Sequence, residues 1–183
     1  MDGAALLSGG QPATLEEVLL AREKRASRQR QAIGCYRLPL ISFSLVAPGA
    51  VKNSPVWRRV ADYAVGEITA LCQQREWVIV WEKRVDERSG PEWMAAVCAP
   101  AKELKRQMLM LETHHALGRL WDIDIVQSDG QSLSRRELGF PARCCLVCQQ
   151  EAHVCARGRQ HTLDLLLDEI ARRIESYERE HCD

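Results

Sequence analysis

The sequence has no excess of charge of either sign, because its 183 residues include 25 Lys and Arg and 25 Asp and Glu. Proteins that bind nucleic acids or membrane surfaces by general electrostatic attraction usually carry a basic excess, so neither class is favoured. No apolar run approaches the roughly 20 residues that a membrane span needs. The first residues lack the basic start and apolar stretch of a secretory signal. We therefore expect a cytoplasmic protein that binds no nucleic acid and no membrane.

What the sequence does contain is eight cysteines, which could form a disulfide framework in an exported protein. Without an export signal, reduced thiols are favoured, and clustered cysteines indicate a metal site before a disulfide. Four of the eight are scattered along the chain, and the other four lie close together at Cys144, Cys145, Cys148 and Cys155.

The pattern of apolar residues predicts an α+β fold. We expect a flexible leader at residues 1–13, an α+β catalytic core at 14–135, and a Cys/His-rich segment with a final helix at 136–183 that packs on the same domain. The core shows the order strand-helix-strand-strand-helix-strand, which is typical of the split β-α-β, or ferredoxin-like, arrangement with a mixed or antiparallel sheet. The expected strands are 38–49, 77–84, 92–100, 120–126 and 131–134, and the expected helices are 14–31, a helix capped at Ser54, 100–118 and 162–179.

Two local signals mark helix starts. Thr14 and Glu17 form a Thr-x-x-Glu capping box. Ser54 precedes Pro55, a favoured pair for the N-cap and the first helical position. The helix that follows Thr14 is strongly basic in its second half, and a solvated face is the favoured interpretation.

The segment "GRLWDIDI" places two acids in a strand of core-like residues. Because strand side chains alternate, Trp121, Ile123 and Ile125 share one face, and Asp122 and Asp124 share the other. Their Cα atoms would lie about 6.5–7 Å apart, so both carboxylates could converge on one divalent cation. Mg²⁺ favours one or two carboxylates completed by water and phosphate oxygens. The alternative is a solvent-facing pair without function.

Basic residues near this pair favour a polyphosphate substrate. Arg119 precedes the strand, and Arg135 follows the hairpin at Asp129-Gly130. Lys52 would join them if the first strand lies beside the fourth.

The cysteine-rich stretch "CLVCQQEAHVCARGRQH" contains four metal-ligating side chains at Cys145, Cys148, Cys155 and His161. This set suits tetrahedral Zn²⁺, and four protein ligands would make the site structural rather than catalytic. His153 is an alternative fourth ligand, and Cys144 an alternative to Cys145. Reduced thiols without metal are the other interpretation. Arg157, beside the cluster, could also face the phosphates.

Four stretches in this order, "LISFSLVAPGAVK", "GRLWDIDIV", "LSRREL" and "CLVCQQEAHVCARGRQH", together resemble the holo-citrate lyase synthase family, also called apo-citrate lyase phosphoribosyl-dephospho-CoA transferase. The resemblance covers nearly the whole chain. It implies transfer of phosphoribosyl-dephospho-CoA from 2'-(5''-triphosphoribosyl)-3'-dephospho-CoA to a serine of the acyl-carrier (gamma) subunit of citrate lyase, with loss of pyrophosphate. This nucleotidyltransferase-type chemistry suggests a nucleotidyltransferase-like α/β fold as the alternative architecture.

The resemblance gives the predicted residues roles. Asp122 and Asp124 would be catalytic and would hold Mg²⁺, while Arg119, with Lys52, Arg135 or Arg157, would neutralise the leaving pyrophosphate. Two other functions remain open: a non-catalytic zinc-bearing adaptor for a carrier protein, and the same transfer to a different carrier, such as that of malonate decarboxylase.

Overall fold

The computed structural model describes residues 3–7 and 9–181. Its centre is a five-stranded sheet in the spatial order β2-β3-β1-β4-β5, with antiparallel pairing throughout. The strands are β1 (Leu40–Leu45), β2 (Val78–Glu87), β3 (Gly90–Cys98), β4 (Trp121–Val126) and β5 (Ser132–Leu133). The α+β class expected from the sequence is confirmed.

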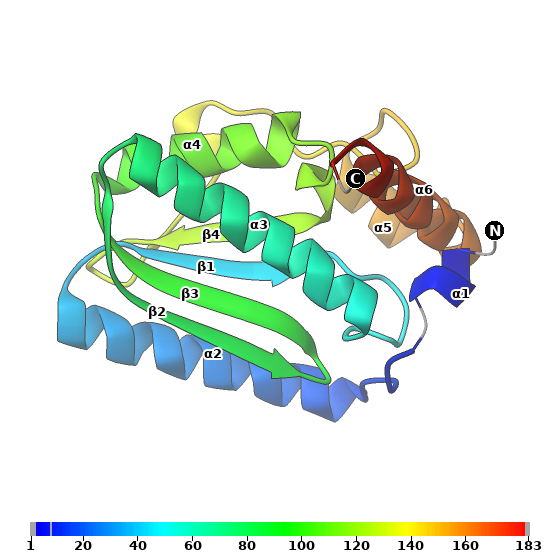
Figure 1. Cartoon of the computed structure of the whole chain (residues 1–183), viewed down its shortest axis with the longest axis horizontal. Helices are drawn as coiled ribbons and strands as arrows, with labels where there is room; N and C mark the ends of the chain where they lie inside the picture. The colour runs from blue at the N-terminus through cyan, green and yellow to red at the C-terminus, as the bar shows by residue number, and fades with distance from the viewer. Residues whose placement is uncertain (1–2, 8, 182–183) are drawn as a thin grey trace.

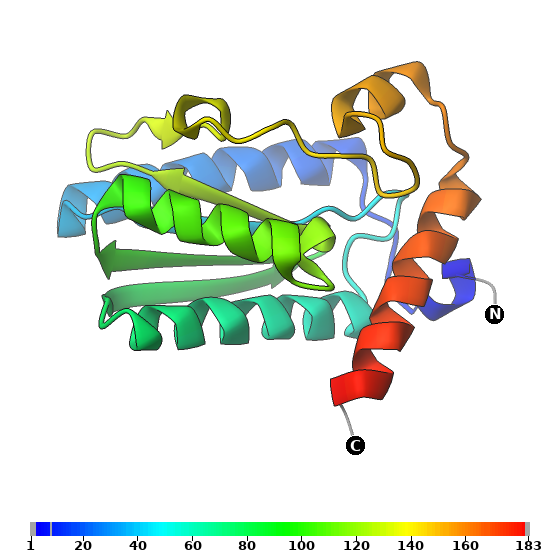
Figure 2. The same ribbon diagram turned by 90° about the horizontal axis from the view of Figure 1, so that it is seen from above.

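Helices cover both faces of the sheet (Figure 1). On one face lie α3 (Pro55–Gln74) and α4 (Ala101–His114), and on the other α2 (Leu15–Tyr36) runs along the strands. The remaining elements are α1 (Gly3–Leu7), α5 (Ala152–Gly158), α6 (Leu163–His181) and the short 3₁₀ helices η1 (Gly118–Leu120) and η2 (Arg136–Leu138). Figure 2 shows α1, α5 and α6 gathered at one end of the sheet, with both chain termini on that side. Among the described helices, none is long and apolar enough to cross a membrane.

The main core lies between the sheet and α3 and α4. Trp57, Ile68 and Met108 from the helices meet Phe43 and Trp121 from the strands, and each is at most 1% exposed. Burying a large apolar side chain contributes about 1.5–3 kcal/mol, so this layer supplies most of the driving force for folding. A smaller cluster under α2 holds the other face.

Both predicted helix starts are confirmed. The hydroxyl of Thr14 accepts a hydrogen bond from the Glu17 N–H, and the Glu17 carboxylate accepts one from the Thr14 N–H. Ser54 caps α3, with Pro55 at the first position. The predicted end of the first helix near residue 31 is wrong, because α2 continues to Tyr36 and ends at Arg37 in the left-handed conformation.

The two ends of the chain pack on each other. The sequence predicted a flexible leader at residues 1–13, whereas the structure has a short helix, α1, inside it. The Gly3 N–H donates to the Asp168 carboxylate of α6 at 2.8 Å, and Leu7 is 3% exposed within the main core. Ile170 and Ile174 of α6 join the same core.

Gly118 permits the tight connection from α4 to β4. A Cβ atom at this position would lie 2.3 Å from the Leu111 carbonyl oxygen, a distance that real Cβ atoms do not reach. The sequence predicted this glycine as a helix stop. It acts after the helix has ended at His114, by letting the chain turn against the last helical carbonyls.

Candidate active site

The two aspartates of β4 lie on one face of the sheet, as the alternation of strand side chains predicted. Trp121, Ile123 and Ile125 are fully buried against α3 and α4. The Asp122 and Asp124 side chains, called the acid pair below, are 43% and 56% exposed on the opposite face. The strand thus keeps its packing face apolar while it presents two carboxylates together.

Small polar residues of β1 lie beside the acid pair. Ser42 is paired in register with Asp124, and Ser44 with Asp122. Gln29 of α2 donates a hydrogen bond to the Ser42 hydroxyl at 3.0 Å and thereby fixes the orientation of this side chain. Short side chains at these positions leave room in front of the carboxylates.

In front of Asp122 and Ser44 lies a small cavity of about 170 Å³, called the acid cavity below. It lies between the sheet and the first half of α2, and its polar walls include Asp122, Glu92, Ser44, Lys52, Arg22 and Arg25. Carboxylates and cations therefore meet in one enclosed space, as a site for a metal-bound anionic substrate requires.

Lys52 is one of the predicted residues that the fold brings to Asp122. The condition for this, that the first strand lies beside the fourth, is met by the pairing of β1 with β4. The Lys52 ammonium donates to the Ala47 carbonyl at 2.5 Å, and burial, followed by the charge of Arg22, lowers its pKa.

Two further cations pair with the acid pair directly. Lys105 Nζ of α4 lies 3.9 Å from Asp124 Oδ1, and Arg143 Nη2 lies 3.2 Å from Asp122 Oδ1. Burial, then repulsion from Asp122, raises the pKa of Asp124, although Lys105 and Arg143 act in the opposite direction. The two carboxylates thus repel each other, and the neighbouring cations reduce this repulsion.

Glu112 of α4 anchors this arrangement from below. It is 1% exposed, and its carboxylate accepts the Ile123 N–H at 2.9 Å and the Arg135 guanidinium at 2.7 Å, with Arg143 as a third donor. Lys105 donates to the Ile123 carbonyl at 2.8 Å. Because β5 pairs only with Ile125 and Val126, Glu112 and Lys105 complete the open edge of β4 where a strand would otherwise lie.

Arg135, a predicted substrate-binding residue, is therefore linked to the acid pair through Glu112 and Arg143. Lys105, Glu112 and Arg143 were not predicted from the sequence. A signal existed for two of them: Lys105 and Glu112 lie seven residues apart on a helix, beside the apolar stripe of Leu104 and Met108, where charged side chains are unexpected. Arg143 carried no such signal.

Two arginines in the basic half of α2 turn toward the sheet, while Arg22, Lys24 and Arg30 are exposed. Glu92 of β3 is 4% exposed, and it accepts hydrogen bonds from Arg25 at 2.8 and 3.0 Å and from Arg28 at 2.5 Å. The prediction of a solvated face is wrong for these two arginines. They hold α2 over the acid cavity, and the charge of Arg25 also acts on Asp124.

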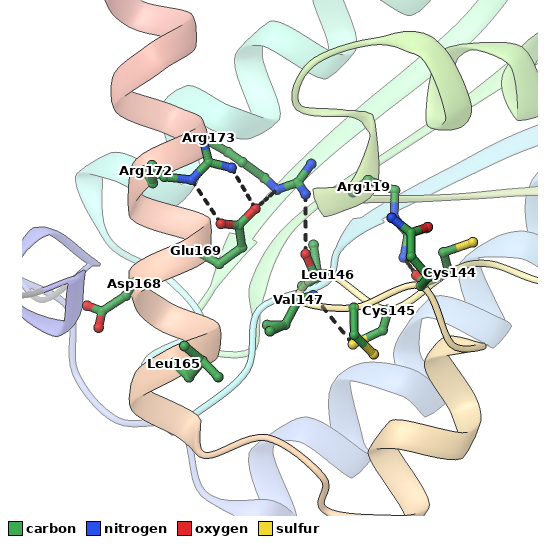
Figure 3. Close-up of a pocket in the computed structure, with 12 residues that line it drawn as sticks. Arg119, Cys144, Cys145, Leu146, Val147, Leu165, Asp168, Glu169, Arg172 and Arg173 are labelled. Carbon is green, nitrogen blue, oxygen red and sulfur yellow. Dashed lines mark hydrogen bonds and ion pairs between the residues drawn. The ribbon is translucent and has the colours of Figure 1, made fainter.

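Arg119 lies in a neighbouring space, the arginine cavity, of about 630 Å³ (Figure 3). Its guanidinium donates to the Cys144 carbonyl. Burial, followed by repulsion from Arg143, Arg135 and Arg173, lowers its pKa. The sequence grouped Arg119 with the aspartates, and the structure instead places it behind Arg143.

The opposite wall of the arginine cavity comes from α6. Arg172 and Arg173 both donate to Glu169, at 2.7–2.9 Å, and Arg173 also donates to the Leu146 carbonyl at 3.2 Å (Figure 3). The final helix is therefore tied to the chain segment that carries Arg143. Arg157, the fourth predicted substrate-binding residue, is exposed on α5 and is not among the residues that line the acid cavity.

The predicted metal ligands Cys145, Cys148, Cys155 and His161, called the Cys/His cluster below, do converge. Their ligand atoms all lie within 4.8 Å of one another. Cys148 Sγ lies 3.5 Å from Cys155 Sγ and 3.3 Å from His161 Nε2. The alternative ligands lie outside this set: Cys144 is exposed, and His153 pairs with Glu151.

The surroundings of the cluster favour the thiolate form of Cys145 but not that of Cys155. Burial opposes ionisation of Cys145, but the N–H groups of Val147 and Cys148 and the neighbouring thiols outweigh it and lower its pKa. Burial raises the pKa of Cys155 to about 12. A bound metal ion would stabilise the negatively charged thiolates, because cysteines bind metal in their deprotonated form.

Comparison with known proteins identifies the family. The family model described as apo-citrate lyase phosphoribosyl-dephospho-CoA transferase matches residues 13–177. The chain belongs to this family. Curated relatives of the same name from Escherichia coli O139:H28 and Shigella boydii serotype 18 are each 42% identical over 157 residues, which is 86% of this chain and 86% of theirs.

The apo-citrate lyase phosphoribosyl-dephospho-CoA transferase family is a family of group-transfer enzymes by name, and the chain is an enzyme of this kind. The matched range includes the acid pair, Arg143, Glu112 and the Cys/His cluster. The resemblance noted in the sequence is thereby confirmed.

Proposed function

We propose that this protein transfers phosphoribosyl-dephospho-CoA from 2'-(5''-triphosphoribosyl)-3'-dephospho-CoA to a serine of the acyl-carrier (gamma) subunit of apo-citrate lyase, with release of pyrophosphate. The observation that carries the proposal is the acid pair, of which Asp122 lines a cavity that also contains Lys52, Arg22 and Arg25, within a chain matched to this family over residues 13–177. A triphosphate donor needs both features: carboxylates for a metal ion and cations for the leaving group.

The acid pair suits Mg²⁺. Asp122 and Asp124 are partly exposed and lie side by side on one face, and burial, followed by repulsion from Asp122, raises the pKa of Asp124. Hard oxygen ligands of this kind are the ones Mg²⁺ prefers. When bound, the ion would neutralise charge on the phosphate oxygens during transfer.

The chain's own cations would bind the donor phosphates. Arg143 and Lys105, which pair with the acid pair, would turn to the phosphate oxygens of a bound donor, and Lys52 lines the acid cavity together with Asp122. Arg135 shares the Glu112 carboxylate with Arg143, and Arg119 adds further positive charge beside them. Arg157 would act only on the outer part of a bound donor.

The reaction then depends on positioning. The serine oxygen of the carrier attacks the α-phosphorus, and pyrophosphate leaves in line with it. Fixed cations such as Arg143 stabilise the charge that develops on the leaving group, and this electrostatic effect supplies most of the rate.

The Cys/His cluster would hold Zn²⁺ as a structural site. Three sulfurs and one imidazole nitrogen within 4.8 Å match a Cys₃His set, and four protein ligands leave no position for substrate. Free thiols of this kind require a reducing compartment, which supports a cytoplasmic location.

The arrangement of the core is best described as ferredoxin-like. In support, α3 lies between β1 and β2 in the chain, α4 lies between β3 and β4, and the spatial order β2-β3-β1-β4 is antiparallel at each pairing. On this basis β5, α2 and the C-terminal segment are additions to a common core.

The test is mass spectrometry of purified apo-carrier subunit after incubation with donor, Mg²⁺ and this protein. We expect a mass increase on one serine and an equal amount of released pyrophosphate, both dependent on Mg²⁺. Bound zinc without any turnover would instead support the adaptor function. Faster modification of the malonate decarboxylase carrier than of the citrate lyase carrier would assign the same chemistry to another partner.

A further inference from the structure

A third cavity lies next to the Cys/His cluster and is not used by the proposed chemistry. Its volume is about 840 Å³. This apolar cavity is lined mainly by aliphatic side chains from separate parts of the chain, among them Val46, Pro48, Leu146, Ala156, Leu163 and Leu166. Sites for small ligands are typically concave, roughly 300–1,000 Å³ in volume and mostly apolar, with a few polar groups.

The apolar cavity and the acid cavity share one wall. Leu45 and Ala47 line the acid cavity, while Val46, Pro48 and Gly49 line the apolar cavity. Neighbouring residues of an extended chain lie only about 3.3 Å apart and point to opposite sides. The two cavities therefore flank the same short segment that leaves β1, and their positions suit the two ends of one elongated ligand that passes around this segment.

The lining of the apolar cavity selects among the parts of such a ligand. Its polar groups are few and are suited to hydrogen bonding with amides or to pairing with a phosphate: Gln160, Thr162 and Arg159. His161 is the only aromatic side chain in the described lining, and it belongs to the Cys/His cluster. Purine rings are commonly held by stacking on aromatic side chains, so an aliphatic chain with amide groups fits this lining better than a base does.

We infer that the apolar cavity binds the pantetheine arm of the dephospho-CoA part of the donor. This inference rests on the proposed function, since the family name supplies the dephospho-CoA group. Arg159, at the same cavity, faces the diphosphate that joins pantetheine to adenosine. The arm anchors the donor while the triphosphate lies at the acid pair, so the Cys/His cluster forms a wall of the substrate site.

Binding experiments test this inference without relying on transfer. Isothermal titration calorimetry would compare dephospho-CoA with ADP, which lacks the pantetheine arm. With the unmodified protein, we expect dephospho-CoA to bind at least tenfold more tightly than ADP. The variant Ala156→Trp narrows the cavity from α5 and should remove that difference.

A matched control is available on the same helix. Val154 is 43% exposed on α5 and is not among the residues that line the cavity, so Val154→Trp should keep the preference for dephospho-CoA. Leu163→Trp narrows the cavity from α6 and repeats the test if Ala156→Trp does not fold.

Equal affinity for ADP and dephospho-CoA in the unmodified protein would overturn the inference. So would a preference for dephospho-CoA that survives both cavity-narrowing variants. Weaker binding of both ligands in Ala156→Trp would assign the cavity to adenosine and reject pantetheine. The carrier-modification assay reports separately on the proposed function, because it can fail while the binding preference remains.

Discussion

The acid pair and the Cys/His cluster are both groups of metal-ligating side chains, but the chain holds them in different ways. Asp122 and Asp124 project from a strand whose neighbours are fixed in register by backbone hydrogen bonds to β1. The Cys/His cluster lies in a segment with a single isolated bridge, between Cys144 and Glu151, and one short helix. The sheet holds the acid pair in position, whereas the segment that carries the Cys/His cluster has little regular secondary structure to hold it.

The two groups should therefore respond differently to substitution: the acid pair by losing charge, and the Cys/His cluster by losing local structure. Changing a carboxylate on a rigid strand removes a charge and leaves the strand in place. Changing a cysteine releases the segment that carries Arg143, because Arg143 and Cys145 are two residues apart and the backbone of both bonds to residues 150–152. The predictions below test whether the two groups behave in these distinct ways.

The largest effect is expected from Asp122→Asn and Asp124→Asn. Each variant removes one charge from the proposed Mg²⁺ site, so we expect transfer to fall by more than about 100-fold, as for other losses of electrostatic stabilisation. Thermal unfolding should change little, since both side chains are partly exposed. Asp129→Asn, in the exposed turn after β4, is the control and should transfer normally. Near-normal transfer by both site variants would exclude the metal-site interpretation.

Loss of zinc should come next in magnitude. Cys148→Ser and Cys155→Ser each remove one ligand of the proposed Zn²⁺ site, so each should lower the zinc content and lower transfer at limiting donor by about tenfold, a typical cost of disturbing the supports of a site. Cys144→Ser alters an exposed thiol outside the cluster and is the matched control. Metal content and donor KM would be measured together.

A double-variant comparison shows whether the zinc effect passes through Arg143. Arg143→Ala alone should raise the donor KM, and Cys148→Ser should add little to it, because coupled changes are not additive. Fully additive effects, or loss of zinc without any change in KM, would show that the Cys/His cluster does not position Arg143, the arginine proposed to bind phosphate.

Glu112→Gln tests whether the buried Glu112 carboxylate holds Arg135 and Arg143 in place. Removal of its charge leaves Arg135 and Arg143 without their shared carboxylate, and breaking a buried ion pair typically costs about 3–5 kcal/mol. We expect a loss of unfolding free energy near the lower end of this range, measured by urea titration. Glu103→Gln changes a partly exposed glutamate on the same helix, keeps an acceptor for Gln107, and should have almost no effect. Equal stabilities of the two variants would show that Glu112 is not an anchor.

Local patterns predicted much of the structure. The alternation along β4 placed the acid pair correctly, and the signals at Thr14 and Ser54 placed two helix starts, because each depends only on residues nearby in the chain. The spacing of the cysteines and His161 likewise anticipated a cluster, since all four lie within one short segment.

Long-range pairings could not be predicted in this way. Glu112 and Arg143 are 31 residues apart, and Arg28 and Glu92 are 64 apart. Charged residues are ordinarily solvated, so only the tertiary fold reveals that the two glutamates are buried and that these arginines are their partners. The same holds for α1, which lies on α6 at the other end of the chain.

The smallest expected effect concerns His115, where the sheet meets the C-terminal helix. Its ring stacks on Trp121 of β4, and its Nδ1 atom accepts the Leu117 N–H at 3.1 Å. Burial lowers its pKa from the usual value, with nearby Glu67 raising it and His181 lowering it. The unfolded chain therefore takes up this proton more readily than the folded protein does, and stability should fall as the pH drops through about 6.5. His115→Asn keeps an acceptor for Leu117 but cannot titrate, so the slope of unfolding free energy against pH should flatten between about pH 7 and pH 5.5. His114→Asn, at an exposed neighbouring position, should retain the slope of the unmodified protein. If His115→Asn retained that slope as well, the acid sensitivity would have to come from other groups. The contact that His115 makes between β4 and α6 would then be insensitive to pH.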